Sequence, residues 1–147
     1  MVLTGNEIYI NIKNENIKIS PFNYSQINNN SYDICLGDKI SFYEDGAMLD
    51  PCGENNLKEV TIGDDGYILK KDKLYIAESL ESLSTEKFVP ILHTKSGIAR
   101  MGIFSHITAD LLSLGTSGKV TFQLYPSVNV RVYKGTAIGQ LSFWVVD

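Results

Sequence analysis

Short apolar runs, each bounded by Gly, Asp, Ser or Pro, follow one another along most of the chain. Several of them alternate apolar and polar residues with a period of two, which is the pattern of a strand with one buried face. Runs of strand length occupy residues 17–19, 32–36, 57–62, 67–69, 73–82, 88–92, 119–125, 128–133 and 137–146. Many short strands separated by turn residues predict an all-β sandwich or barrel with little helix.

One short helix is expected close to the amino terminus. Thr4 and Glu7, three residues apart, form a capping-box pattern for a helix over residues 6–12, which should be the longest helix of the chain. Two turn regions are also expected. Gly37 and Asp38 separate two short strand patterns and predict a hairpin-like turn. The turn-rich residues 44–56 predict a surface loop.

Length and charge narrow the class of protein. The 147 residues predict one domain over 1–147 whose core is large enough to be stable without disulfides or a structural metal. No stretch approaches the roughly 20 apolar residues of a membrane span, and the amino terminus lacks a signal-peptide pattern, so we expect a cytoplasmic protein that does not act at a membrane. The net charge of −4 argues against a nucleic-acid partner. Cys35 and Cys52 lack CxxC spacing and metal partners, and we expect neutral thiols and no metal site.

Residues 93–109, HTKSGIARMGIFSHITA, carry the most distinctive chemistry. Lys95, Ser96, Gly97 and Arg100 lie within six positions. They could hold a phosphate-bearing ligand if backbone amides and the hydroxyl turned toward the anion at a turn or short helix start, with a cation nearby. K-S-G is also common in ordinary loops, so the alternative is a polar turn between two strands.

Six motifs, in order along nearly the whole chain, together resemble the dCTP deaminase and dUTPase superfamily, and more closely its dCTP deaminase branch. The resemblance implies a distorted jelly-roll β-barrel of the dUTPase-like kind and a homotrimer with nucleotide sites at its subunit interfaces. It also implies a pyrimidine deoxynucleoside triphosphate with Mg²⁺ on its phosphates, and no catalytic metal. The motifs are IKISP at 17–21, SYDICLG at 31–37, ESLESL at 78–83, KSGIARMGI at 95–103, SHITA at 105–109 and KGTAIGQLSF at 134–143.

The same resemblance implies roles for the residues of the KSGIAR segment. Lys95, Ser96 and Gly97 occupy the family segment that holds the phosphates. Lysine keeps the positive charge there but lacks the bidentate fork of arginine. Arg100 matches the arginine that, together with Ser96, positions the reactive end of the pyrimidine site.

Base recognition is implied for a second group of residues. Ile107, Thr108 and Ala109 match the family segment whose backbone reads the base edge, and Gln123 would face the base. Gln140, in the last motif, is a further predicted nucleotide contact. The neighbouring His106 matches the family, but a lone histidine in an apolar segment is expected to pack in the core.

The positions that carry catalysis in the family read differently here. Gln123 stands where the family has the glutamate that takes a proton from the attacking water and returns it to the departing amine. A neutral amide cannot accept that proton, and such catalysis contributes about 10² to 10⁴ in rate. Ser113 replaces an aspartate and Thr116 an aromatic residue. Asp110 is not expected to substitute, because an odd offset on an extended strand turns it to the opposite face.

Three hypotheses follow. The first is a homotrimeric nucleotide-binding protein, a sensor, regulator or sequestering protein, that catalyses little or no deamination. Family enzymes continue past the last strand into a tail that closes over the nucleotide, whereas this sequence stops at Asp147; a lost tail would favour this hypothesis, and a native tail removed after Asp147 is the alternative. The second is a dCTP deaminase that forms dUTP and ammonia, with Gln123 an engineered Glu-to-Gln substitution. The third is an interaction module whose trimer surface binds an unidentified protein partner.

Asp33 is expected to be structural or to lie near the metal-bound phosphates.

Overall fold

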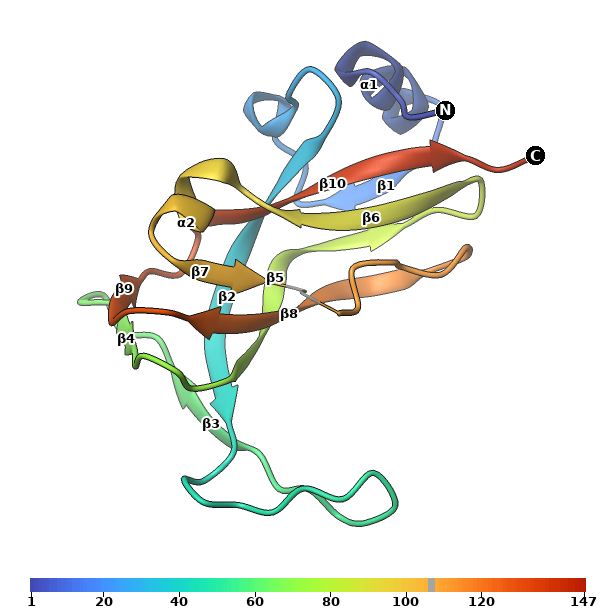
Figure 1. Cartoon of the computed structure of the whole chain (residues 1–147). Helices are drawn as coiled ribbons and strands as arrows, with labels where there is room; N and C mark the ends of the chain where they lie inside the picture. Colours follow the sequence, from blue (N-terminus) through green and yellow to red (C-terminus); the bar gives the residue numbers. More distant parts are fainter. Residues whose placement is uncertain (106–107) are drawn as a thin grey trace.

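The computed structural model describes residues 1–105 and 108–147, and strands dominate it (Figure 1). The predicted all-β class is therefore confirmed. The helical elements are α1 (Gly5–Lys13), the 3-10 turn η1 (Tyr24–Gln26) and α2 (Ser96–Arg100). The strands are β1 (Lys18–Ser20), β2 (Tyr32–Phe42), β3 (Lys58–Thr61), β4 (Tyr67–Leu69), β5 (Tyr75–Ser84), β6 (Phe88–Thr94), β7 (Ile103–Ser105), β8 (Ser117–Pro126), β9 (Val130–Val132) and β10 (Ala137–Val145).

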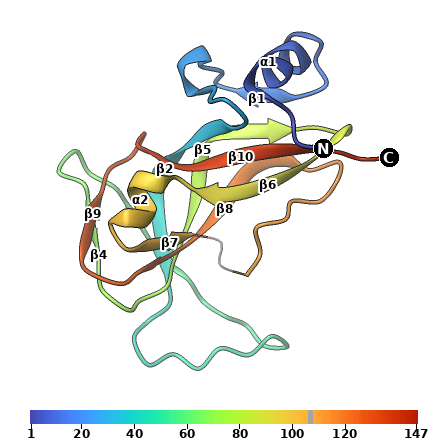
Figure 2. The same cartoon turned by 45° about the horizontal axis from the view of Figure 1, so that its top comes forward.

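The main sheet is antiparallel and curls into a nearly closed barrel (Figures 1 and 2). Its strand order is β6-β10-β2-β5-β8-β7, with β1 paired to β5 and β3 paired to β2, while β4 and β9 form a separate pair. The two ends of this order meet where the Oγ1 of Thr94 lies 2.7 Å from the Oγ of Ser105. The barrel expected from the resemblance is thus present, and α2 forms the connection between β6 and β7.

Strand alternation places the core inside this barrel. Along β5 every second residue is buried from Tyr75 to Leu83, as a period of two requires for a sheet with one apolar face. The largest fully buried side chains come from α1 and from strands on all sides of the barrel. They include Ile8, Ile17, Tyr32, Ile34, Leu36, Ile40, Tyr75, Leu92, Phe122 and Phe143.

The hairpin-like turn predicted at Gly37 and Asp38 is wrong, because β2 runs through both residues without a break. Glycine has a different purpose at this position. A Cβ on Gly37 would lie 2.8 Å from the carbonyl oxygen of Glu78 on β5, so the missing side chain allows the two backbones to approach. The β2–β5 register shifts between Leu36 and Ile40, which identifies the glycine as part of a bulge region.

Three local predictions are confirmed. The capping box forms, since the Oγ1 of Thr4 accepts from the Glu7 amide at 3.3 Å and the Glu7 carboxylate accepts from the Thr4 amide at 2.7 Å. Residues 44–56 form an exposed loop that projects from the barrel (Figure 1). Cys35 and Cys52 are free, and burial raises the pKa of the Cys35 thiol to about 12. In the part of the chain described here, no helix is both long and apolar enough to cross a membrane.

Candidate functional site

The KSGIAR segment forms a short helix start, as one of the two sequence interpretations predicted. Lys95 is the N-cap residue of α2, with extended backbone angles, and its amide donates to the carbonyl oxygen of Ile138 on β10 at 3.1 Å. No side chain caps the helix. The backbone therefore ties the start of α2 to β10, and the lysine side chain is free to reach another partner.

That partner is Asp33 on β2. The Nζ of Lys95 forms an ion pair with Oδ2 of Asp33, and the two side chains are 32% and 10% exposed. Asp33 lies opposite Gln140 in the β2–β10 register, and both residues are largely covered. The fold thus brings Lys95, Asp33 and Gln140 together, and we call these three residues the α2 side of the site.

Most of the remaining residues of the segment face solvent, whereas Ile98 packs against the core. Ser96, Gly97 and Arg100 are exposed, and a Cβ on Gly97 would meet no atom within 4 Å. Among the described residues Arg100 forms no ion pair, so its guanidinium is available to an anion. An exposed hydroxyl and an exposed cation one turn apart can bind an anionic ligand.

Gln123 lies in a different place, on the outer face of β8. Its backbone is paired with Ile76 of β5, and its side chain is half-buried and makes contacts. Thr108 and Ala109 are exposed in the segment that precedes β8. We call Gln123, Thr108 and Ala109 the β8 side of the site. The predictions for His106 and Ile107 lie outside the described residues.

The argument against Asp110 as a substitute acid assumed an extended strand, and that assumption is wrong. Residues 108–116 form no strand, and only Leu111 makes an isolated bridge, to Ile91 of β6. Asp110 and Ser113 are both exposed. Strand alternation therefore does not set the relative directions of these two side chains.

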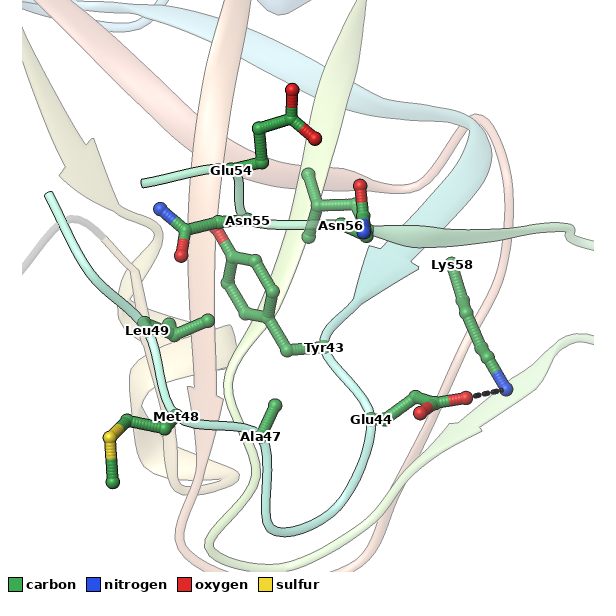
Figure 3. A pocket seen from close by; sticks show the side chains of 10 residues that line it. Tyr43, Glu44, Ala47, Met48, Leu49, Glu54, Asn55, Asn56 and Lys58 are labelled. Carbon is green, nitrogen blue, oxygen red and sulfur yellow. Dashed lines mark ion pairs between the residues drawn. The ribbon is translucent and has the colours of Figure 1, made fainter. Parts of the chain in front are cut away.

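One cavity of the described chain borders the β8 side, because Ile76 and Thr121, the neighbours of Gln123, line it. Five cavities of about 250 to 460 Å³ are lined by none of Lys95, Arg100, Gln123 or Gln140. Figure 3 shows one of them, under the 44–56 loop, where Tyr43 forms a wall and Glu44 pairs with Lys58. These five cavities therefore do not enclose the predicted residues.

Four polar residues that the sequence interpretation did not assign to the site lie beside its α2 side. They are Gln26, Asn28, Ser31 and Glu81. Gln26 and Asn28 belong to the polar, Asn-rich stretch of residues 26–30. A run of asparagines carries no periodic signal, so nothing in it separates a side chain that contacts the barrel from one that faces water. The described residues contain no group of three His, Cys, Asp or Glu that could hold a metal ion.

Three comparisons with known proteins agree on the relationship. The dCTP deaminase-like family model matches residues 2–146. A dUMP-forming dCTP deaminase of Hathewaya histolytica is 38% identical over 147 residues, which are 100% of this chain and 84% of the relative, and one of Clostridium acetobutylicum is 35% identical over 97% of this chain and 82% of the relative.

The fold has a solved counterpart as well. The crystal structure of a 2′-deoxycytidine 5′-triphosphate deaminase from Agrobacterium tumefaciens superposes with a TM-score of 0.78 at 21% identity, over 99% of this chain and 48% of that one. At this identity the match concerns the fold alone, and this chain spans about half the length of that protein. With the family model and the two relatives, the conclusion is that this chain belongs to the dCTP deaminase-like family.

Proposed function

We propose that the chain binds a pyrimidine deoxynucleoside triphosphate, dCTP in the first place, and that deamination is the reaction it performs on it. The observation that carries the proposal is the cluster at the start of α2, where Lys95 is held against Asp33 while Ser96 and Arg100 stay exposed. Two cations and a hydroxyl within six consecutive residues suit a polyphosphate. Relatives with dCTP deaminase in their names support dCTP as the nucleotide.

Mg²⁺ would arrive with the nucleotide. A triphosphate carries several negative charges, whereas the Lys95–Asp33 pair is neutral as a unit and Arg100 adds one positive charge. A divalent cation on the phosphates would offset the difference, and oxygen ligands suit Mg²⁺. Asp33 is the carboxylate closest to Lys95 that could accept hydrogen bonds from water on such an ion.

We further propose a homotrimer in which the site is completed between subunits. Ser96, Arg100, Thr108 and Ala109 are exposed on the single chain, and none of the five cavities described above is lined by a residue of either side of the site. Exposed polar groups that lack a common pocket within one chain can share one across an interface. The α2 side of one subunit would then meet the β8 side of another.

Deamination places one demand that the chain meets poorly. Water adds to C4 of the cytosine, ammonia leaves, and a group must take the water proton and return it to the amine. Gln123 can orient the water but cannot take its proton. The relatives favour the deaminase hypothesis, and Gln123 favours slow turnover. A nucleotide-binding protein without turnover is the second candidate function, and Gln123 is the observation in its favour.

The test is a binding and turnover assay on one preparation. The purified chain is incubated with Mg²⁺ and dCTP or dUTP, and retained nucleotide and products are quantified by chromatography with mass detection. Slow release of deoxyuridine nucleotides from dCTP supports the deaminase proposal. Stoichiometric retention of dCTP without product supports the second candidate. A chain that retains no nucleotide and forms no product refutes both.

A further inference from the structure

A chain of hydrogen bonds joins the loop before β2 to two predicted nucleotide-binding residues. The Nδ2 of Asn28 donates to Oδ1 of Asp33 at 2.6 Å and to the Oγ of Ser31 at 3.3 Å. The other oxygen of Asp33 pairs with Lys95, and the Oγ of Ser31 donates to Oε1 of Gln140 at 2.7 Å. One side-chain amide therefore connects Lys95 on one branch with Gln140 on the other.

The chemistry of each branch requires a donor at Asn28. A carboxylate with one oxygen held by an N–H cannot rotate freely, so the bond to Oδ1 fixes the direction in which Oδ2 of Asp33 meets Lys95. On the second branch the Ser31 hydroxyl accepts a hydrogen bond from Asn28 and donates one to Gln140. Because Gln140 is bonded there through its oxygen, its N–H donors are not used in that bond and can serve a ligand.

The loop that carries Asn28 is itself held from two directions. The Nε2 of Gln26 donates to the carbonyl oxygen of Asp33 at 2.7 Å and to Oε1 of Glu81 at 2.8 Å, and Glu81 is only 1% exposed. Gly5 also lies against the loop, since its amide donates to the backbone oxygen of Asn29 at 2.6 Å and a Cβ on it would clash with the backbone oxygen of Asn28. The backbone that carries Asn28 is thus held in place by contacts with Gln26, Glu81 and Gly5.

We propose that Asn28 is a positioning residue that orients Lys95 through Asp33 and Gln140 through Ser31 for a single ligand, the pyrimidine deoxynucleoside triphosphate. This rests on the proposed function and adds to it the residue that aligns the two contacts. The coupling has a measurable consequence. Loss of the Asn28 amide weakens nucleotide binding through Lys95 and Gln140, although Asn28 itself need not touch the nucleotide.

The experiment measures dCTP binding in the presence of Mg²⁺ by isothermal titration calorimetry. Asn28→Ala is expected to weaken binding about tenfold, because it removes two hydrogen bonds that align charged and polar contacts. Asn28→Ser offers one hydroxyl proton for two acceptors and should show an intermediate loss. The matched control is Asn30→Ala, two residues away in the same loop, whose side chain is exposed. It should bind dCTP like the wild-type chain.

A second set of variants separates positioning from damage to the fold. Thermal unfolding first establishes which Asn28 variants are folded. In a Lys95→Ala background, Asn28→Ala should cost only about threefold, because one of the two branches no longer ends in a contact. A purely structural role predicts the same loss in both backgrounds.

The outcomes separate this proposal from the proposed function. If the wild-type chain retains no dCTP, the proposed function is wrong and the role of Asn28 falls with it. If the wild-type chain binds dCTP and the folded Asn28→Ala and Asn28→Ser variants bind it equally well, only the positioning role is wrong. An equal loss in the presence and absence of Lys95 likewise overturns it.

Discussion

The two sides of the site differ in how much of their geometry one chain provides. On the α2 side, Lys95, Asp33 and Gln140 are joined by an ion pair and hydrogen bonds to braced loop residues. On the β8 side, Thr108 and Ala109 are exposed in a segment that makes one isolated bridge to β6, and Gln123 lies on the outer face of the barrel. The difference has a physical reason. A charged side chain that is partly buried against the barrel needs an ion-pair or hydrogen-bond partner, whereas residues that would contact a base through their backbone can remain exposed to solvent.

The largest expected contrast is in thiol reactivity, because Cys35 lies two residues from Asp33 and Cys52 lies in the exposed 44–56 loop. Burial, followed by the nearby Glu81 charge, raises the pKa of Cys35 to about 12. A pKa that far above the ordinary value of about 8.5 lowers the thiolate fraction by roughly three orders of magnitude. Because a thiolate of higher pKa is also more nucleophilic, part of this difference is offset, and iodoacetamide at pH 8 with peptide mass spectrometry should label Cys52 about 10² times faster than Cys35.

Comparable labelling rates for the two thiols would contradict the fixed geometry inferred for the α2 side, because they would mean that Cys35 becomes exposed as readily as a residue of a surface loop. A Cys52→Ser variant serves as the control, since its remaining label can come only from Cys35. Labelling of that variant in denaturant gives the rate for the unprotected Cys35 thiol.

The next largest effect is expected on the β8 side, from Gln123→Glu. A carboxylate at this position can take the water proton that the amide cannot, so dCTP turnover should rise by about 10² or more. The measurement is product formation from dCTP under single-turnover conditions. Thr121→Glu is the matched control, because it adds the same charge two residues away on the same outer face of β8. No gain from Gln123→Glu, or an equal gain from Thr121→Glu, would contradict the role inferred for this position.

Sequence alone predicted much of the barrel and less of the site. Strands β5, β6, β8, β9 and β10 and helix α1 follow from period-two alternation and from the Thr4–Glu7 capping box, which are local signals, whereas β7 was not predicted. The predicted turn at Gly37 was wrong because a glycine is required there by the close approach of β5, a strand about 40 residues later, and not by the local sequence. One domain over 1–147 and a cytoplasmic location stay predictions.

For the site, sequence indicated the residue types but not their pairing. Lys95 was expected to hold phosphates, and the structure adds that Asp33 already holds Lys95. That pairing joins residues more than 60 positions apart, so no local pattern could reveal it. The bonds of Asn28 and Ser31 depend in the same way on how the loop before β2 folds against β10.

On the α2 side, Lys95→Ala is expected to weaken dCTP binding by about ten- to a hundredfold, the range for loss of a hydrogen bond to a charged group. Lys95→Arg keeps the charge and should retain most of the affinity. The readout is the dissociation constant by calorimetry with Mg²⁺ present. Lys39→Ala removes a lysine from an exposed pair with Glu59 and is the matched control. Unchanged affinity in Lys95→Ala would remove the phosphate role from the α2 side.

The smallest effect is expected from Thr4→Ala, which sharpens the comparison by loosening the helix start that lies against the Asn28 loop. Loss of the N-cap should lower the free energy of unfolding by about 1 kcal/mol, measured by urea denaturation. Asn6→Ala, exposed in the first turn of α1, is the control. If the loop is braced mainly by Gln26 and Glu81, dCTP affinity should change less than about threefold, well below the loss in Asn28→Ala.

The capping box also gives this variant a pH signature. Hydrogen bonds from the Thr4 amide and hydroxyl hold the pKa of Glu7 below its ordinary value of 4.5. A carboxyl whose folded pKa is lowered adds stability above that value, and the added stability is lost as the pH falls through the folded pKa. The stability difference between wild type and Thr4→Ala should therefore shrink when urea denaturation is repeated below pH 4.5. A difference that is independent of pH would mean that the hydrogen bond from the Thr4 hydroxyl to the Glu7 carboxylate adds no stability, since the backbone amide of residue 4 still donates to Glu7 in the variant.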